Sequence, residues 1–534
     1  MGKYVIAYDI GTTGVKTCLF EIDETIKLVD GESMGYGLYL VEGGGAEQDT
    51  EEWWGAMAET TKKILDKTGV NPDKIEGISF CSQMQGLIVI DKEGNALRRP
   101  MSYMDQRAKE EIKKGIANGI QVAGANITKL LPYLYYTGAV SSSVKDPIWK
   151  YKWIEAHEPE IFAKIYKILD VKEYLIGRMT GRFIMTPDSA FGELLYDTRK
   201  GHEGWCEPVC KMMGINMDHL AEIVDSTAVV GGLTAKAAAD LGLAEGTPVF
   251  GGGGDASLIG VGAGSVRVGD THIYSGTSGW VSTVVDKQMV DVTAMIAAIV
   301  GAQPGYFNYF AEMETAGKCL DWCKNHIAAD EVGIYLEKHD VTESNENYEA
   351  EYTSLYDYMS QVIDSVPAGA NGVIFTPWLH GNRCPFEDPN AAGMFFNLNI
   401  DTGKSDLFRA VVEGVCYHQR WMLEASSKKT ATSDPIRFVG GGALSPVTCQ
   451  ILADITGRKI ETVADPQNVG AVGAAAVVGV GIGLIKDLED VRNFIPATHT
   501  YLPNPENKAI YDHHFEVFKT LYKNNKKAFA MLNS

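Results

Sequence analysis

The side chain best placed to do chemistry is Asp255, the one ionisable residue in the glycine-rich segment 251–264. The four glycines at 251–254 let the backbone approach a ligand closely, because no Cβ stands in the way. Residues 256–261 are small and mostly apolar, and they predict the start of a helix. A lone carboxylate at such a strand-to-helix corner is a candidate general base, although an aspartate that only caps the helix gives the same pattern.

A second chemical pattern is the hydroxyl-rich turn at 11–14, which lies between two strand-like segments, 4–10 and 15–20. The amides and hydroxyls of Thr12 and Thr13 are suited to wrapping a phosphate group. Asp9 ends the first strand, where it can hold a metal ion or its water, and Lys16 adds positive charge. An ordinary hairpin turn is the alternative interpretation.

The same unit recurs in the second half of the chain. Residues 271–284 predict a strand, a Gly276-Thr277-Ser-Gly turn and a return strand, which echoes the N-terminal hairpin. Two copies separated by roughly 265 residues indicate an internal duplication into two related domains, because that period is far too long for a solenoid. Two opposed hairpins can grip a polyphosphate from both sides, which favours the phosphate interpretation over the plain turn.

A third glycine loop, at 440–446, follows an apolar strand and opens a helix, with Ser445 at the N-cap and Pro446 at the first helical position. We expect Gly441, Gly442 and Ala443 to bind a flat ring or a ribose directly against their backbone. A dinucleotide site is the competing idea, but the GxGxxG spacing of that site is not met.

Two polar segments of the N-terminal half are suited to touching a polyol. Met84 and Gln85 lie in a polar turn between two predicted strands. Tyr103, Asp105 and Arg107 alternate, so they share one face if the chain is extended there. A plain turn and a surface ion pair between Asp105 and Arg107 are the alternatives.

The elements that position these residues imply an α/β protein with two large domains, which we expect at 1–248 and 249–534. The net charge of −21 argues against a nucleic acid or an anionic membrane as partner. No signal peptide or spanning helix is expected. The nine cysteines form no CxxC pair, which favours a reducing cytoplasm.

Taken in order, these motifs resemble those of the FGGY family of carbohydrate kinases, and within it the xylulose kinases. Segments 9–16 and 275–279 look like the two phosphate loops of the family, and 253–255 looks like its catalytic motif. Segment 440–446, followed by 450–457, looks like its adenosine motif. Segments 147–153 and 406–413 resemble its two signature patterns. The resemblance implies two ribonuclease-H-like domains of the actin/hexokinase type facing across a central cleft.

The resemblance also implies a reaction, the ATP-dependent phosphorylation of a ketopentose-type sugar, D-xylulose to D-xylulose 5-phosphate or a related ketose or polyol. Asp255 would be the base, and Met84, Gln85, Asp105 and Asp255 would line the sugar pocket. Mg²⁺ would lie near Asp9. ATP would contact residues of the three loops, namely Thr12, Thr13, Lys16, Gly276, Thr277, Gly441, Gly442 and Ala443. A cytoplasmic homodimer would fit the family.

The chain departs from the xylulose kinase pattern where the sugar is chosen. Gln85 stands where these kinases usually carry His, Tyr103 where they carry Trp, and Asn382 where they carry Glu. Gln85 can still hydrogen-bond a hydroxyl, but it cannot become cationic. A kinase for another sugar (ribulose, fuculose, gluconate or erythritol) and an inactive or sugar-sensing homologue that only binds nucleotide are therefore the alternatives.

Overall fold

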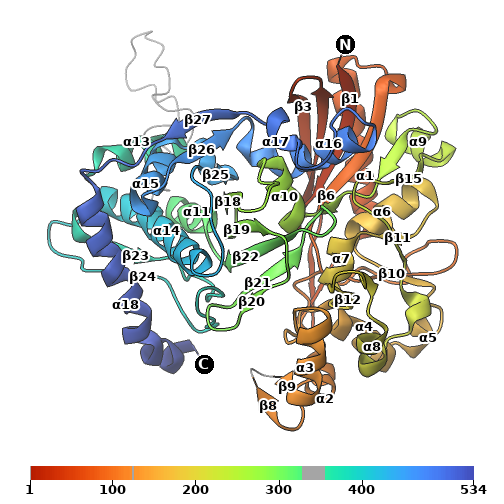
Figure 1. The fold of residues 1–534 in the computed structure, drawn as a ribbon, viewed down its shortest axis with the longest axis horizontal. Helices are drawn as coiled ribbons and strands as arrows, with labels where there is room; N and C mark the ends of the chain where they lie inside the picture. Colours follow the sequence, from red (N-terminus) through yellow and green to blue (C-terminus); the bar gives the residue numbers. More distant parts are fainter. Residues whose placement is uncertain (1, 123–124, 328–354, 534) are drawn as a thin grey trace, which may run out of the picture.

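The computed structural model describes residues 2–122, 125–327 and 355–533. Two large β-sheets, one built from each half of the chain, form the centres of the molecule, and helices pack against both (Figure 1). Helix α10 (Asp255–Gly262) lies between the two halves, and helix α16 (Val469–Gly481) returns from the C-terminal half to the N-terminal sheet.

The N-terminal sheet has the strand order β15-β16-β6-β1-β2-β3, and β17 pairs with β6 beyond the end of β16. Strands β1 and β2 form the predicted hairpin, and β6 runs parallel to β1. The bounds are β1 Lys3–Ile10, β2 Gly14–Ile22, β3 Ile26–Gly35, β6 Ile75–Ser82, β15 Val229–Gly232, β16 Pro248–Phe250 and β17 Gly253–Gly254.

Alternating residues of β1 enter two different cores, because successive side chains of a strand point to opposite faces of the sheet. Ile6 and Tyr8 join a core that contains Trp53 and Met57 of helix α1 (Thr50–Thr68). Val5 and Ala7 join a second core, which contains the small residues of α16. The N-terminal sheet is therefore covered on one face by its own half of the chain and on the other by the C-terminal half.

The C-terminal sheet has the order β20-β21-β22-β19-β18-β25-β26-β27. Its hairpin β18–β19 is antiparallel and β25 runs parallel to β18, as β6 runs parallel to β1, so the predicted repeat is present in the topology. The bounds are β18 Thr271–Ser275, β19 Gly279–Val285, β20 Val290–Asp291, β21 Ile296–Val300, β22 Phe307–Met313, β25 Ile436–Val439, β26 Ile460–Val463 and β27 Ala497–Tyr501.

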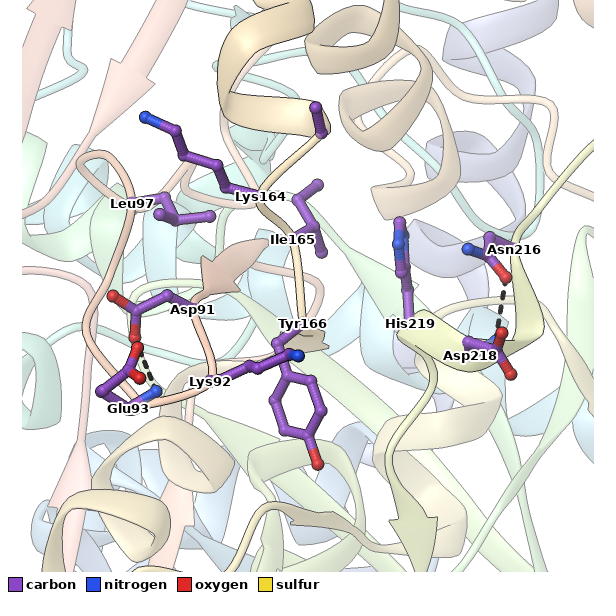
Figure 2. A pocket seen from close by; sticks show the side chains of 11 residues that line it. Asp91, Lys92, Glu93, Leu97, Lys164, Ile165, Tyr166, Asn216, Asp218 and His219 are labelled. Atoms are coloured by element: carbon purple, nitrogen blue, oxygen red, sulfur yellow. Dashed lines mark hydrogen bonds between the residues drawn. The ribbon is translucent and has the colours of Figure 1, made fainter.

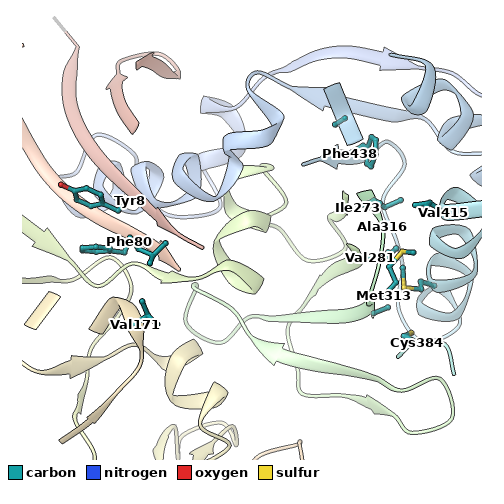
Figure 3. Close-up of a cluster of buried hydrophobic side chains, with 14 of the residues drawn as sticks. Tyr8, Phe80, Val171, Ile273, Val281, Met313, Ala316, Cys384, Val415 and Phe438 are labelled. Atoms are coloured by element: carbon teal, nitrogen blue, oxygen red, sulfur yellow. The ribbon is translucent and has the colours of Figure 1, made fainter. Parts of the chain in front are cut away.

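Helices of the C-terminal half enclose its sheet. The amphipathic helix α14 (Lys404–Ser427) packs against β19 and β22, and Figure 3 shows Val415 of this helix beside Ile273 and Val281 of the hairpin. The other helices and strands here are α11 Gly317–His326, α13 Leu355–Ser365, β23 Ile374–Thr376, β24 Met394–Phe396, α15 Pro446–Thr456, α17 Val491–Phe494 and α18 Lys508–Asn533.

Residues between β6 and β15 form a mainly helical region at the lower edge of the N-terminal half (Figure 1). Trp149 and Tyr151 are buried in its core, as expected for a packed aromatic segment. Its principal elements are β7 Ile88–Ile90, α2 Lys109–Gly115, α3 Ile127–Tyr136, α4 Pro147–His157, α5 Pro159–Phe162, β10 Lys167–Leu169, α6 Val171–Thr180, α7 Pro187–Gly192 and α8 Glu207–Met213. Helix α9 (Ala235–Leu241) follows β15 and packs against α1 and α6.

Two details differ from the sequence-based expectations. We predicted a boundary after residue 248, but β16 and β17 hydrogen-bond to β6, so the chain supplies strands to the N-terminal sheet as far as Gly254. Residues Tyr103 and Met104 form a turn rather than an extended segment, because the amide of Asp105 bonds back to the carbonyl of Ser102. Among the described residues, no helix is both long enough and apolar enough to span a membrane.

Candidate functional site

Asp255 lies at the start of α10, directly after the short strand β17. Gly254 is the N-cap residue, so Asp255 is the first residue of the helix and not its cap. Burial raises the pKa of Asp255 to about 7; the amide of Ala256 opposes this rise, and the charges of Asp9, Glu312 and Asp188 add to it. A carboxyl group with a pKa near neutrality is suited to accepting a proton at physiological pH.

Asp9 of β1 lies at the same level of the N-terminal sheet as Gly253 of β17, two residues before Asp255. It is aligned with Cys81 of β6, which is aligned on its other side with Gly253 of β17. Burial raises the pKa of the Asp9 carboxyl, and the nearby Lys16 charge opposes the rise. The sheet therefore places Asp9 near the end of β1 and Asp255 directly after the end of β17, and these two strands flank β6 and run parallel to it.

A cavity of about 370 Å³ opens in front of Asp255. Thr12 of the first hairpin turn, Ser278 of the second, and the sugar-pocket candidates Met84 and Gln85 all line it. The structure thus brings together residues from both halves that are far apart in sequence. The remaining lining includes Gly11, Gln83, Tyr103, Ser143, Lys145, Asp146, Asp188, Phe191, Gly192, Trp280, Phe310, Glu312, Glu314 and Arg383.

Asp105 does not line this cavity. It is fully buried, accepts a hydrogen bond from the amide of Ala46 at 2.9 Å, and pairs with Arg107 at 2.7 Å. This buried pair replaces the surface pair that we considered as the alternative. Its neighbour Tyr103 does line the cavity, and Thr12 Oγ1 lies 3.4 Å from the Tyr103 hydroxyl.

The predicted nucleotide loops lie side by side in the C-terminal half, because their strands β18 and β25 are parallel neighbours. Gly440 has a φ of 91°, and a Cβ at this position would lie 2.6 Å from the carbonyl oxygen of Ser275. A Cβ on Gly442 would lie 2.9 Å from Ser275 Cβ. Glycine is therefore required where the third loop packs against the second hairpin.

The outer residues of the three predicted nucleotide loops, the first hairpin turn included, are accessible to a ligand. Thr13, Thr277 and Gly441 are exposed, Gly276 and Gly442 are partly exposed, and Ala443 is buried. None of the six lines the cavity at Asp255, although Ser278 follows Thr277 directly. Lys16 points elsewhere: its Nζ donates to the carbonyl of Gln467 at 2.8 Å, and it lines a separate hollow with Asp465 and Asn468.

Sequence reasoning did not single out several charged residues of the cavity. Arg383 pairs with Glu312 at 2.5 Å and with Glu314 at 3.2 Å. Asp188 accepts a hydrogen bond from the amide of Gly254 at 2.7 Å. The sequence gives a partial signal for Arg383, because it directly follows Asn382, where the chain departs from the xylulose kinase pattern, but that departure does not show what the Arg383 side chain contacts.

A second hollow, of about 640 Å³, lies on the N-terminal half around the turn at 91–93 and His219 (Figure 2). Lys92, Lys164 and Tyr166 also contribute to its wall. It contains none of the predicted site residues, so size alone does not identify the functional cavity.

Comparison with known proteins supports the family resemblance of the sequence. The model of the FGGY family of carbohydrate kinases, N-terminal domain, matches residues 4–262, and that of the C-terminal domain matches residues 272–482. A xylulose kinase of Bacillus subtilis (strain 168) is 28% identical and covers 100% of this chain and 99% of its own length. A gluconokinase of Bacillus licheniformis is also 28% identical, covering 96% of this chain and 94% of its own.

Among solved structures, the ligand-bound xylulose kinase from Lactobacillus acidophilus superposes with a TM-score of 0.82 at 25% identity, covering 99% of this chain and 100% of that chain. These similarities confirm the predicted fold of two ribonuclease-H-like domains of the actin/hexokinase type.

Proposed function

The chain belongs to the FGGY family of carbohydrate kinases, and on this premise we propose that it transfers the γ-phosphoryl group of ATP to a hydroxyl of a neutral ketose. D-xylulose, giving D-xylulose 5-phosphate, is the first candidate. One observation carries the proposal: a single cavity holds the carboxyl of Asp255, the first Gly-Thr turn and the end of the second turn. A general base and two phosphate-binding hairpins are what phosphoryl transfer to an alcohol requires.

In this proposal the sugar binds in the cavity against Met84, Gln85 and Asp255. The ionised Asp255 accepts the proton of the attacking sugar hydroxyl. The oxygen of that hydroxyl bonds to the γ-phosphorus, and the bond from the γ-phosphorus to ADP breaks, so that ADP leaves. Removing that proton contributes about 10²–10⁴-fold to the rate. Alignment of the hydroxyl with the γ-phosphate, and exclusion of water from the cavity, contribute most of the remainder.

The nucleotide would extend over the C-terminal half. Thr12, Thr13, Gly276 and Thr277 would hold the phosphates, and the loop at 441–443 would hold the adenosine. Asp9 fits a Mg²⁺ site, because Mg²⁺ is commonly held by one or two carboxylates together with the nucleotide phosphates. The Asp9 carboxylate is half-buried, with the positive charge of Lys16 nearby and a hydrogen bond from the side chain of Cys81. Bound Mg²⁺ would neutralise phosphate charge during transfer.

The charge of the cavity favours a neutral substrate over a sugar acid. Its lining contains the acidic residues Asp146, Asp188, Asp255, Glu312 and Glu314. Of the two basic residues there, Arg383 is already paired with Glu312 and Glu314, which leaves Lys145 as the second cation against five acidic side chains. A carboxylate such as that of gluconate would meet like charges here, which makes D-xylulose or a related ketose a better candidate than gluconate. A cytoplasmic location and a homodimer also belong to this proposal.

ADP release measured over a panel of ketoses, polyols and gluconate tests the function. We expect release that depends on a ketose, and a kcat lower by about 10²–10⁴-fold in Asp255→Asn with ATP binding retained. Near-normal turnover in that variant would remove Asp255 from the base role. Nucleotide binding without release for any sugar would support the sugar-sensing alternative, and release independent of sugar would indicate a simple ATPase.

A further inference from the structure

The backbone of Gln85 has an unusual conformation at the wall of the cavity. Its φ is 64°, in the left-handed region that residues other than glycine rarely adopt. Such a conformation persists only where the surroundings hold it in place, and these residues concentrate at ligand sites. The groups that hold Gln85 are therefore candidates for a role in binding.

Asp170 holds the backbone amides at this point. Its Oδ2 accepts a hydrogen bond from the amide of Gln85 at 2.7 Å, and its Oδ1 accepts one from the amide of Gly86 at 3.0 Å. Asp170 is the N-cap of α6 and is only 2% exposed. A Cβ on Gly86 would lie 2.9 Å from Asp170 Oδ1, so a glycine at 86 allows the carboxylate to approach.

Lys150 of α4 holds the carbonyl oxygen of the same residue. Its Nζ donates to Gln85 O at 2.9 Å and also to the carbonyl oxygen of Lys145, and the residue is fully buried. Gln85 and Lys145 both line the cavity. One buried ammonium group therefore ties two separate segments of the cavity wall together.

Asp170 and Lys150 hold the backbone of Gln85 and leave its own side chain at the wall of the cavity. Its Nε2 lies 3.4 Å from the carbonyl of Gly192, a long contact. In the part of the chain that the structure describes, no hydrogen bond engages its Oε1, and a sugar hydroxyl can donate to this atom.

We propose that Asp170 and Lys150 are positioning residues that clamp the backbone of Gln85, so that its side-chain amide reads the configuration of one sugar hydroxyl. The inference rests on the proposed function and deepens it. An amide held in one position accepts a hydrogen bond from a hydroxyl in one configuration. The epimeric sugar directs that hydroxyl elsewhere and leaves the amide without a partner, and this unpaired polar group costs binding free energy. Asp170 and Lys150 touch no reacting atom, so their effect is on the choice of sugar.

The test compares kcat/KM for D-xylulose and its epimer D-ribulose in the full-length protein. In Asp170→Asn we expect the ratio of kcat/KM for the preferred sugar to kcat/KM for its epimer to fall by roughly tenfold, which corresponds to the loss of one hydrogen bond to a charged group. The KM for ATP should be unchanged. Lys150→Met should lower the ratio in the same direction, and it serves as the second variant should Asp170→Asn fold poorly. Circular dichroism checks the folding of each.

A double-mutant cycle with Gln85→Ala separates positioning from general damage, because residues that act through one another are not additive. In the Gln85→Ala background, Asp170→Asn should change the ratio no further. Asp197→Asn is the matched control: Asp197 is also buried and accepts a backbone amide, that of Arg199 at 3.0 Å, but it lies outside the cavity, so the ratio should stay at the wild-type value.

The outcomes are distinguishable. An active wild-type protein whose ratio is unaltered in both Asp170→Asn and Lys150→Met would overturn the clamp and leave the kinase proposal intact. An equal loss for both sugars, or a full effect of Asp170→Asn in the Gln85→Ala background, would also overturn it. A wild-type protein that phosphorylates no ketose or polyol would overturn the proposed function and the clamp together.

Discussion

At the scale of single residues, the surroundings of Asp255 are as informative as Asp255 itself. Asp188 accepts hydrogen bonds from the Gly254 amide and from the Ser257 hydroxyl, on either side of Asp255. Thr186 donates to Asp188 at 2.5 Å, and Lys172 donates to Thr186 at 2.6 Å. The segment on either side of Asp255 is thus held in place by a buried chain of polar groups that extends into α6.

Asp188 also affects the pKa of Asp255, because its negative charge disfavours a second charge nearby. The base must be ionised to act, so we expect kcat/KM for the sugar to rise with pH through about 7. Asp188→Asn removes the like charge, and the acid limb of the profile should move to lower pH by about half a pH unit. The measurement is kcat/KM against pH for wild type and variant.

Asp197→Asn provides the comparison for this profile, because it alters a buried aspartate that does not line the cavity of Asp255. An acid limb that moves to higher pH in Asp188→Asn, or that moves equally in Asp197→Asn, would contradict the assignment.

At the scale of elements, helices α10 and α16 touch through their backbones. A Cβ on Gly473 of α16 would fall far inside contact distance of the Leu258 carbonyl oxygen, and one on Gly262 of α10 would do the same at the carbonyl of Val469. Gly470, at the start of α16, lies against Asp9 and Cys81. The helix that carries Asp255 is therefore held against the helix that covers Asp9, and glycine is needed at each contact.

Gly473→Ala should lower the free energy of unfolding by about 1–3 kcal/mol, because a methyl group forced between two backbones must push them apart. Displacement of α10 should also lower kcat, since catalysis is sensitive to shifts of about 1 Å in the base. Urea unfolding and steady-state kinetics measure the two effects.

Gly55→Ala is the matched control, because Gly55 lies within helix α1 and a Cβ there meets nothing within 4 Å. It should raise stability by roughly 0.5–1 kcal/mol and leave kcat unaltered. If Gly473→Ala left kcat unaltered and did not lower the free energy of unfolding, as expected for this control, the close contact between α10 and α16 would not determine the position of Asp255.

Much at this scale was predictable from local pattern. Both hairpins, the helix after Asp255 and the Ser445 cap follow from strand residues, turn glycines and capping chemistry close together in the chain. Asp105 was not predictable, because its burial depends on Arg107 folding back onto it and on the amide of Ala46.

At the scale of the whole molecule, the cavity is shared between the two halves of the chain. Met84, Asp188 and Asp255 come from the N-terminal side, whereas Trp280, Glu312 and Arg383 come from the C-terminal side. The repeated hairpins predicted two domains around a cleft, but the acidic character of the lining was hidden, because its residues come from at least six separate segments that only the fold brings together.

A site divided in this way should couple its two ligands. If the sugar contacts mainly the first half and the nucleotide mainly the second, binding of one brings together the groups that bind the other. We expect a non-hydrolysable ATP analogue and the sugar together to raise the unfolding temperature by more than the sum of their separate effects.

Thermal unfolding with each ligand alone and with both measures this coupling. The coupling free energy should be about 1–3 kcal/mol, and it should persist in Asp255→Asn, which changes the reacting group and keeps the cleft. Strictly additive shifts would indicate that the two ligands bind without any change in the relation between the halves.

The packing of α16 on the N-terminal sheet also has a consequence for synthesis on the ribosome. Strand β6 ends at Ser82, but the helix that covers Val5, Ala7 and Phe20 ends at Gly481, roughly 400 residues later. At about 5–20 residues per second, this apolar face waits on the order of 20–80 s for its cover. The nascent chain is therefore a natural client for chaperones that shield apolar surface, and slow elongation or truncation before α16 should favour aggregation over release of a folded half.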